Sequence, residues 1–300
     1  MSRVRLSYAK RAVLAAAALI ASLVSVTAHA APAMWRVTGA SSEIYLFGTL
    51  HALDPATRWR TPAYDAAYEK AGVVWFEADL GRADPASMAL ILNQYGVDPD
   101  KGLSEKLAPA DLAALKGQAD LARIDHLRPW AAAMMLSMQP VISGGASVQA
   151  GADASVTRAA RAGGKQIKVF ETLEDQARMF AGLSEPAEVA YLSDVIRQRA
   201  RPAQKLSLRP ATASSLEAEW LAGDLAKLGP GLVRDMGHDN PGLYEALLKN
   251  RNLAWADTLT QELGQAQGVE LVNVGALHLV GADGLPALLK ARGFKVERVQ

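Results

Sequence analysis

Two short stretches far apart in the chain decide how this sequence is interpreted: LFGTLH at residues 46–51 and NVGALH at residues 273–278. Each has an apolar run, a glycine, two further residues and a histidine, and the two histidines lie 227 positions apart. Glycine permits a tight turn where a strand ends, so we expect His51 and His278 to project beyond strand ends. In α/β proteins, ligands bind at the carboxyl edge of the sheet. The two stretches therefore predict one site to which both ends of the chain contribute.

Further strands are predicted near both ends of the chain. An opening hairpin is expected from residues 35–38 and 43–49, with its turn at residues 39–42. Three other runs are rich in β-branched and aromatic residues and apolar on both faces, which is typical of buried strands in a mixed or parallel sheet. These runs are residues 73–78, 167–171 and 269–274. Residues 294–299 alternate in polarity and predict a final edge strand.

Between these strands the apolar residues recur at helical spacing. The predicted helices are residues 62–71, 109–123, 152–161, 173–181, 187–200, 213–228 and 243–263. Thr172 and Asp175 have the spacing of a capping box, and Asp283 is expected to cap a helix over residues 284–292. The fold predicted is therefore α/β, with a mixed central sheet formed from N- and C-terminal segments and a large helical insertion between them.

The first thirty residues have the layout of a secretory signal peptide. A basic start is followed by an apolar run at residues 13–25 and by a small-x-small cleavage site that ends at Ala30. The apolar run is shorter than the roughly 20 residues of a membrane span, although an uncleaved anchor is the alternative interpretation. We therefore expect an exported chain, periplasmic or secreted, that begins near Ala31 and forms a single domain over residues 31–300.

Composition excludes several classes of function. The 300 residues contain no cysteine, which excludes disulfides, thiol nucleophiles and cysteine-bound metals. Lys and Arg number 32 against 31 Asp and Glu, and removing residues 1–30 leaves 28 against 31. A chain of this charge has no basic footprint for nucleic acid. No later segment has 18 consecutive apolar residues, so no stable membrane span is expected after residue 30.

Carboxylates follow the same strand-end pattern as the histidines. Glu77 comes near the end of one buried strand and Glu171 ends another. Two histidines and one or two glutamates at neighbouring strand ends could hold a divalent metal with open positions. Alternatively, Glu77 pairs with a nearby arginine, Glu171 supports the following helix, and both histidines are structural.

These motifs resemble those of the TraB/GumN family. The resemblance covers residues 34–300, and its motifs occur in the family's order. They are the corners at residues 48–51 and 272–285, the strand with Glu77, Gly151-Ala152-Asp153, residues 164–165 and 170–176, and Arg251-Asn252. The resemblance implies a fold shared with erythromycin-esterase-like and ChaN-like proteins. It also implies kinship with animal membrane metalloproteases that cleave secreted Wnt signals.

In those relatives, the paired histidine motifs and a glutamate are thought to form a metal-dependent hydrolytic site. Carried over by motif, His51, His278 and Glu77 are the candidate ligands of a divalent metal ion, and Glu77 is also a candidate base. Glu171 is the alternative general base, and Arg251 would hold a substrate carboxylate or an oxyanion. The resemblance therefore implies an exported metal-dependent hydrolase that acts on a peptide or small-molecule substrate as a protease or an esterase.

Two other functions stay open at this point. A non-catalytic protein could sequester a peptide signal or a haem-like ligand, with a histidine as an axial iron ligand. A structural domain of the cell envelope could use the histidine corners only to tie strands together. His126 and His238 lie in polar connections and are expected to be structural or exposed.

Overall fold

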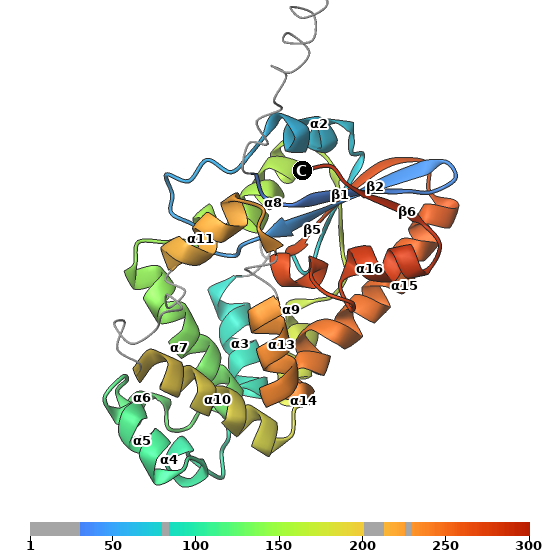
Figure 1. Ribbon diagram of the computed structural model, residues 1–300. Helices are drawn as coiled ribbons and strands as arrows, with labels where there is room; N and C mark the ends of the chain where they lie inside the picture. The colour runs from blue at the N-terminus through green and yellow to red at the C-terminus, as the bar shows by residue number, and fades with distance from the viewer. Residues whose placement is uncertain (1–30, 80–83, 201–212, 226–229) are drawn as a thin grey trace, which may run out of the picture. The chain divides into compact units, whose positions relative to one another are not determined.

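The structure is a computed structural model that describes residues 31–79, 84–200, 213–225 and 230–300. Residues 31–300 form one compact unit, and the described residues contain one six-stranded sheet (Figure 1). The strands are β1 (Met34–Thr38), β2 (Ser42–Thr49), β3 (Val73–Phe76), β4 (Gln166–Val169), β5 (Gly268–Gly275) and β6 (Lys295–Arg298). This arrangement confirms the predicted α/β fold with a mixed sheet built from both ends of the chain. The predicted signal peptide lies outside the described residues.

The sheet has the strand order β4-β3-β5-β2-β1-β6. Strands β4, β3, β5 and β2 are parallel, whereas β1 is antiparallel to β2 and to β6. Strand β5, from the C-terminal part of the chain, lies between β2 and β3, from the N-terminal part. Its register pairs Gly275 with Thr49, so the two predicted histidine corners begin side by side. The predicted hairpin and the predicted edge strand are both confirmed.

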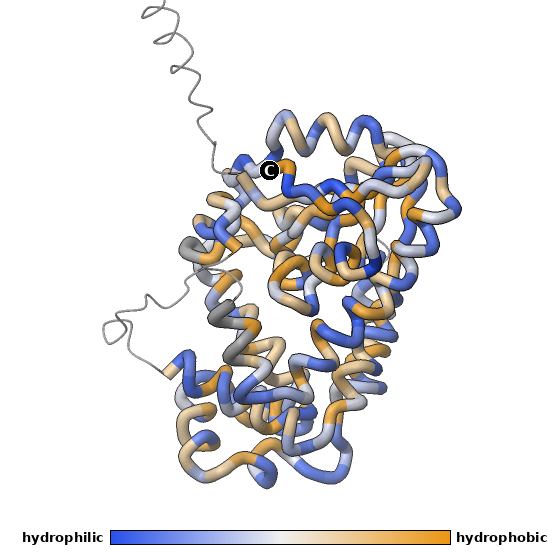
Figure 2. Tube along the Cα trace, turned by 45° about the vertical axis from the view of Figure 1, so that its right-hand side comes forward, coloured by the Kyte–Doolittle hydropathy of each residue, from blue (hydrophilic) through white to orange (hydrophobic). Residues whose placement is uncertain are grey.

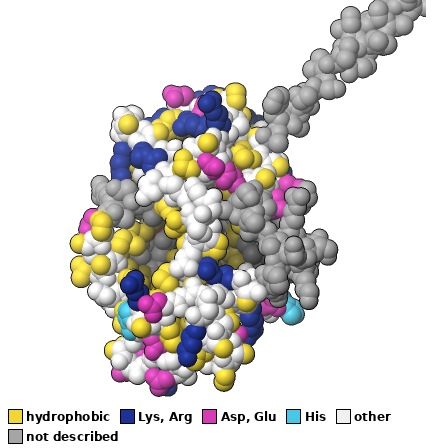
Figure 3. All heavy atoms as spheres, turned by 90° about the vertical axis from the view of Figure 1, so that its left-hand side faces the viewer, with side chains coloured by type: hydrophobic (Ala, Val, Ile, Leu, Met, Phe, Trp, Pro, Cys, Tyr) yellow, Lys and Arg dark blue, Asp and Glu magenta, His cyan; other side chains and the backbone are white. Residues whose placement is uncertain are grey.

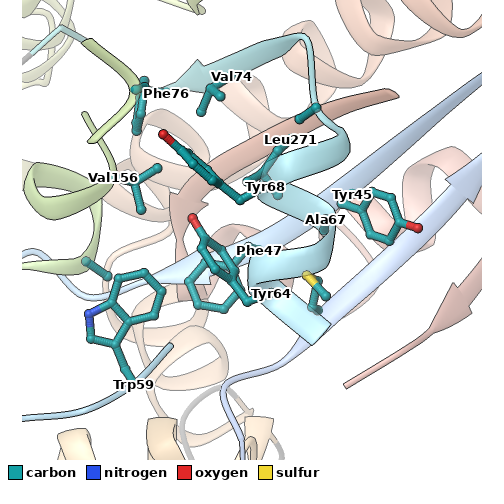
Figure 4. Close-up of a cluster of buried hydrophobic side chains, with 14 of the residues drawn as sticks. Tyr45, Phe47, Trp59, Tyr64, Ala67, Tyr68, Val74, Phe76, Val156 and Leu271 are labelled. Carbon is teal, nitrogen blue, oxygen red and sulfur yellow. The ribbon is translucent and has the colours of Figure 1, made fainter. Parts of the chain in front are cut away.

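One face of the sheet is covered by α2 (Pro62–Lys70), α8 (Ala152–Ala162) and α11 (Ala213–Leu221). Large aromatic residues fill the layer between them, and Phe47 lies at its centre, with ring centroids 4.5 Å from Tyr64 (Figure 4). Two polar groups are satisfied within this layer: the Tyr64 hydroxyl lies 3.0 Å from Asn273 Oδ1, and Trp220 donates to the Gly48 carbonyl at 2.7 Å. These bonds allow aromatic residues with polar ends to be buried against the sheet.

The other face is covered by α15 (Asn250–Gln265) and α16 (Leu285–Ala291). Successive strand residues point to opposite faces, so Leu46 packs on this side while its neighbour Phe47 packs on the other. Residues Trp255, Leu259 and Leu289 of the two helices complete this second core. The predicted buried strands are apolar on both faces because helices cover both sides of the sheet.

A separate helical region lies beyond the carboxyl edge of the parallel strands (Figure 1). Its helices are α3 (Pro85–Tyr95), α4 (Leu103–Lys106), α5 (Pro109–Lys116), α6 (Leu121–Ile124), α7 (Pro129–Ser143), α9 (Leu173–Ala181), α10 (Glu185–Ala200), α13 (Pro230–Asp239) and α14 (Pro241–Tyr244). It has its own core, in which Trp130 and Phe180 stack with ring centroids 5.0 Å apart. Within this core, Arg128 forms an ion pair with the buried Glu188.

Three short turns complete the architecture near the sheet edge. They are the 3-10 turns η2 (Val148–Ala150) and η4 (Ala276–Leu279) and the π-helical turn η3 (Glu245–Lys249). The π-helical turn joins α14 directly to α15, so the predicted helix over residues 243–263 is continuous but locally widened. Such widened turns are frequent at functional sites.

The surface carries both hydrophobic and hydrophilic side chains. Helices on the outside alternate between hydrophobic and hydrophilic residues, as expected when one side of each packs on a core (Figure 2). Hydrophobic side chains also gather around the hollow on the face that includes α7 (Figure 3). Among the described residues, the exposed large hydrophobic side chains include Met88 and Leu90 on α3 and Met134 on α7. Within the described parts of the chain, no helix is long and apolar enough to cross a membrane.

Two helix predictions were wrong in detail. The helix expected over residues 109–123 ends after Lys116, and Gly117 is its C-cap. A new short helix then begins at Leu121, because the side chain of Asp120 accepts a hydrogen bond from the backbone of Ala122. Likewise, α11 ends at Leu221 rather than at residue 228, and Gly223 follows with a positive φ of 64°. Residues 226–229 lie outside the described residues.

The predicted capping roles had mixed outcomes. Thr172 and Asp175 form the expected capping box of α9. Asp283, however, does not cap α16: Gly284 is the N-cap, and the carboxylate of Asp283 accepts a hydrogen bond from the Tyr244 hydroxyl at 2.6 Å. The Asp283 side chain therefore bonds to a residue distant in sequence, and not to the helix end that the local sequence predicted.

Burial of β2 predicts a clear difference between two Leu→Ala substitutions. Leu46 is fully buried between β2 and α15, whereas Leu90 on α3 is 70% exposed. We expect Leu46→Ala to lower the free energy of unfolding by about 2–5 kcal/mol and Leu90→Ala to change it by less than about 0.5 kcal/mol. Urea denaturation of a chain that begins at Ala31 measures both, and similar losses for the two variants would contradict this assignment of the core.

Candidate functional site

Four parallel strands end side by side, and the predicted site residues follow their order. From β4 to β3, β5 and β2, the residues at or just beyond the strand ends are Glu171, Glu77, Gly275 and His51. His278 follows Gly275 within η4. The carboxyl edge of the sheet therefore brings together residues from opposite ends of the chain.

Gly275 marks the point on which three of these side chains converge. A Cβ atom added to Gly275 would lie 3.1 Å from Glu77 Oε1, 3.6 Å from His51 Nε2 and 3.7 Å from His278 Cδ2. The φ of Gly275 is −51°, which any residue can adopt, so the surrounding space and not the backbone requires glycine here. The three predicted metal ligands thus border one small space.

His51 is held from behind by a carboxylate. Its Nδ1 lies 3.1 Å from Oδ2 of Asp153, which is in the first turn of α8 and only 7% exposed. Loss of solvation lowers the pKa of His51, but the hydrogen bond and charge of Asp153, with the charge of Glu77, outweigh this effect and raise it. The His51 side chain is 56% exposed, so water screens part of this attraction. The other ring nitrogen, Nε2, borders the space at Gly275.

A glycine positions Asp153 against the histidine corner. A Cβ atom at Gly151 would lie 2.3 Å from the carbonyl oxygen of His51, so only glycine fits at this contact. The next backbone N–H, that of Ala152, donates to the carbonyl of Leu50 at 3.0 Å. The start of α8 is thus fixed to the end of β2, and Asp153 is brought under the imidazole.

His278 has partners at both ring nitrogens and is 4% exposed. Arg251 Nη1 lies 3.1 Å from Nε2 and can only donate, so Nε2 accepts and Nδ1 carries the proton. Nδ1–H in turn donates to Asn252 Oδ1 at 2.6 Å. Burial, together with the charges of Arg251 and His51, lowers the pKa of His278 to about 3, against the opposing effect of Glu77. His278 is therefore a neutral imidazole with a fixed tautomer.

Arg251 lies at the centre of the charges. Its Nε donates to Glu171 at 3.1 Å, and its Nη1 donates to His278 and to the carbonyl of Leu247, the latter at 3.0 Å. Its Nη2 donates to Glu77 Oε2 at 2.7 Å and also to Glu171. These bonds use all five N–H groups of the guanidinium. Binding a substrate carboxylate, the role predicted for Arg251, would require one of these bonds to open.

Glu77 is ionised within this cluster. Its Oε1 accepts the Gly275 N–H at 2.6 Å, and its Oε2 accepts from Arg251. Burial alone would raise the pKa of Glu77, but its electrostatic interaction with the His278 ring, the charges of Arg251 and His51, and the Gly275 N–H hold this pKa well below its usual range. Oε1 also lies 3.6 Å from His278 Nε2, so this carboxylate oxygen faces the space that Gly275 leaves open.

Glu171 occupies the outer end of the cluster, beyond Arg251. Besides its two bonds with Arg251, it accepts a hydrogen bond from Gln176 Nε2 at 2.8 Å. Its backbone N–H donates to the Glu77 carbonyl at 3.0 Å, which extends the β3–β4 ladder to the site. Glu171 therefore orients Arg251, whereas Glu77 is the carboxylate nearest the two histidines.

The donor set fits a divalent metal in kind and in charge. Imidazole and carboxylate are the ligands such ions prefer, and metal-bound histidines have the opposite ring nitrogen hydrogen-bonded, as Asp153 and Asn252 do here. Two carboxylates, Glu77 and Glu171, flank the guanidinium of Arg251, and a third, Asp153, lies beside His51, so the cluster is rich in negative charge. As placed, however, Arg251 takes the lone pair of His278 Nε2, and among the described residues no group of three or more His, Cys, Asp or Glu is spaced to hold an ion. Metal binding would require this contact to open.

Sequence reasoning assigned no role to two residues that orient the histidines. Asp153 and Asn252 lie in motifs noted for their family resemblance, and that resemblance was the signal that could have identified them. Their partners could not be inferred, because the contacts span 102 and 26 positions. His126 and His238 lie outside the site: both are exposed, and His238 pairs with Asp239.

The residues of this site lie within the part of the chain that is similar to known proteins. The model of the TraB/PrgY/gumN family matches residues 33–298, which include every site residue named above. The proteins described as "Uncharacterized protein YbaP" in Escherichia coli (strain K12) and in Shigella flexneri are each 29% identical over 164 residues. That region is 54% of this chain and 56% of each relative, so the match covers little more than half the length of these curated relatives. No solved structure matches the chain.

Charge balance at Arg251 predicts a large loss of stability on its removal. We expect Arg251→Met to lower the free energy of unfolding by about 3–5 kcal/mol, because Glu77 and Glu171 would stay buried without a counter-charge. Arg178→Met is the matched control: Arg178 is 62% exposed and pairs with Glu174, so the change should cost at most about 1 kcal/mol. Urea denaturation measures both variants.

A compensating variant separates charge from packing. Glu77→Gln and Glu171→Gln, added to Arg251→Met, should restore part of the lost free energy of unfolding, since no unpaired charge then remains. Equal losses in the single and triple variants would show that Arg251 stabilises the fold by packing instead.

Proposed function

Because the chain belongs to the TraB/PrgY/gumN family, we propose that it is an exported, metal-dependent hydrolase that cleaves a peptide or ester bond. One observation carries this proposal: His51, His278 and Glu77 border a single space at Gly275, and separate partners fix both imidazole rings. A site of this kind, at the carboxyl edge of a parallel sheet, is where α/β proteins bind ligands.

The proposed ion would be held by His51 Nε2, His278 Nε2 and Glu77. When bound, a divalent ion provides a water of low pKa and polarises the carbonyl that the water attacks. Asp153 and Asn252 keep the Nε2 atoms directed at the common space. Three carboxylates against Arg251 and a protonated His51 leave the cluster with a net negative charge, which favours a cation, and the ion would take the place of the His51 proton.

Glu77 is the third ligand or the proton acceptor in this proposal. As acceptor, it would take a proton from the water as the new bond forms between the water oxygen and the carbonyl carbon. Its low pKa makes it a weak base, so this role depends on an ion that lowers the pKa of the water. The proton then passes to the leaving amine or alcohol as the old bond breaks, so the step is balanced. Glu171, on the outer side of Arg251, keeps the guanidinium beside Glu77 in either case.

Arg251 competes with the ion for His278. Its Nη1 must leave His278 Nε2 before that nitrogen can bind a metal, while its bonds to Glu77 and Glu171 can remain. Arg251 thus keeps the neutral imidazole paired in the metal-free protein. We propose that metal binding exchanges this one contact and leaves the rest of the cluster in place.

The proposed location follows from the first thirty residues. Their basic start, apolar run and small-x-small site have the layout of an export signal. An enzyme in the periplasm or outside the cell must be stable without disulfides here, since the chain has no cysteine. Its substrate would be a peptide or a small ester available in that compartment.

Substitution of His51 tests the proposed site. We expect the purified chain to bind a divalent ion, and His51→Ala to lose both the ion and more than about 99% of hydrolytic activity. The measurements are metal analysis and cleavage of a peptide library and of aryl esters, with and without chelator. His238→Ala is the control, because this histidine is 86% exposed and lies outside the site.

Three other outcomes of these experiments would each support a different conclusion. Full activity after chelation would contradict the requirement for a metal ion. The His51–Asp153 pair would then be the group that moves the proton. Peptide or haem binding that His51→Ala abolishes, without any turnover, would favour the non-catalytic protein. Unchanged activity in His51→Ala would reject the site itself.

Gly275 provides a second test, which distinguishes a need for open space at the site from an effect on the stability of the fold. Gly275→Ala places a methyl group 3.1 Å from Glu77 Oε1, so we expect activity and metal affinity to fall by at least about tenfold. Gly264→Ala is the matched control: nothing lies within 4 Å of its added Cβ, and an alanine within α15 should stabilise the helix slightly. If both variants retain full activity, the space at Gly275 is not the reaction site.

A further inference from the structure

A surface cavity of about 400 Å³ lies between α9 and α15, at the β4 end of the sheet edge. Ligand pockets generally range from about 300 to 1,000 Å³, so it is large enough for one side chain or a small group. Its lining includes Phe170 and Trp255, with Met179 and Ala254 on facing helices. Trp255 also packs against the site described above, with its ring centroid 4.5 Å from that of His278.

The floor of the cavity is a rigid aromatic stack. Phe170 and Trp255 have ring centroids 4.9 Å apart and an interplanar angle of 19°, and Trp75 stacks on the far side of Phe170 at 4.8 Å. Both faces of Phe170 are covered by tryptophans and Trp255 is only 3% exposed, so the stack offers ring edges to the cavity. A flexible methionine such as Met179 adapts to the shape of what binds there. The cavity therefore favours an apolar group, aromatic or aliphatic.

The inner wall of this cavity is part of the charged cluster. Arg251 and Glu171 line it, and Arg251 also stacks on the Trp255 ring at 4.5 Å. Arg251 then donates to Glu77, which faces the space beside His51. The cavity thus shares Arg251 and Glu171 with the charged cluster of the candidate site.

Strand spacing sets the length of a ligand that reaches both places. The cavity lies at the end of β4 and His51 at the end of β2, three strand positions away. At roughly 4.8 Å per strand this separation is about 14 Å, which an extended peptide spans with about four residues. A single amino acid or a small ester cannot occupy both.

We propose that this cavity binds an apolar side chain of an extended peptide substrate, about four residues from the bond at the His51 site. The inference rests on the proposed hydrolase and narrows its substrate from any peptide or ester to peptides of about five residues or more. The ring edge of Phe170 and the side chains of Met179, Ala246 and Ala254 provide the apolar lining that selects this side chain.

Equilibrium binding tests this assignment independently of turnover. The probes are acetyl-Phe-Ala-Ala-Ala-Ala-Ala-amide and its all-alanine analogue, titrated by calorimetry into His51→Ala so that neither is cleaved. We expect the phenylalanine peptide to bind at least about tenfold more tightly, as burial of one aromatic side chain predicts. Ala254→Trp, which fills the opening, should abolish the difference.

Ala110→Trp is the matched control, because Ala110 is an exposed alanine in α5, far along the chain from the cavity. It should preserve the preference for phenylalanine. Thr258→Trp, on the same wall as Ala254, repeats the test in case the first variant fails to fold. Equal affinity for the two peptides, or a preference that survives both tryptophans, would overturn the proposal. Tight, selective binding without any cleavage by the unsubstituted chain would refute the hydrolase alone and keep the binding site.

Discussion

The guanidinium of Arg251 connects the structural elements that meet at the carboxyl edge of the sheet. Arg251 is buried among two carboxylates, a neutral imidazole and a backbone carbonyl, and each of its five N–H groups has a partner. A charge in such a place is tolerated only when it is fully compensated. The ends of β3 and β4, the η4 turn and the start of α15 must therefore adopt one mutual arrangement. The π-helical turn contributes directly, since it supplies the Leu247 carbonyl that accepts one of these bonds.

The position of Arg251 also gives the two histidines different burial, charge and pairing. His278 is buried, neutral and paired at both nitrogens, whereas His51 is half exposed and is paired with Asp153 at Nδ1. Two corners that share the Gly-x-Leu-His pattern thus have different chemical states, because Arg251 lies beside one and Asp153 beside the other. A shared motif is therefore no guide to equality of function.

Strands, corners and fold class could be predicted because each depends on local pattern. Apolar runs predicted β3, β4 and β5, and glycine followed by histidine located both corners. The partners of Arg251 could not be predicted, since they depend on the position of β5 between β2 and β3. Asp283 and Gly117 show the same limit on a smaller scale: one side chain bonds to a distant tyrosine, and one glycine ends a helix that periodicity would continue. Whether the site binds a metal stays a prediction.

The central place of β5 has a consequence for the order in which the chain can fold. Until residues 268–275 have been synthesised, β1 and β2 have no contact in the sheet with β3 and β4, and the two halves remain separate. Contacts of such long sequence separation form slowly. The carboxyl edge of the parallel strands is thus completed late, and a chain that ends before residue 275 cannot form the candidate site. Late closure of this kind would suit the proposed export, since an exported chain crosses the membrane before it folds.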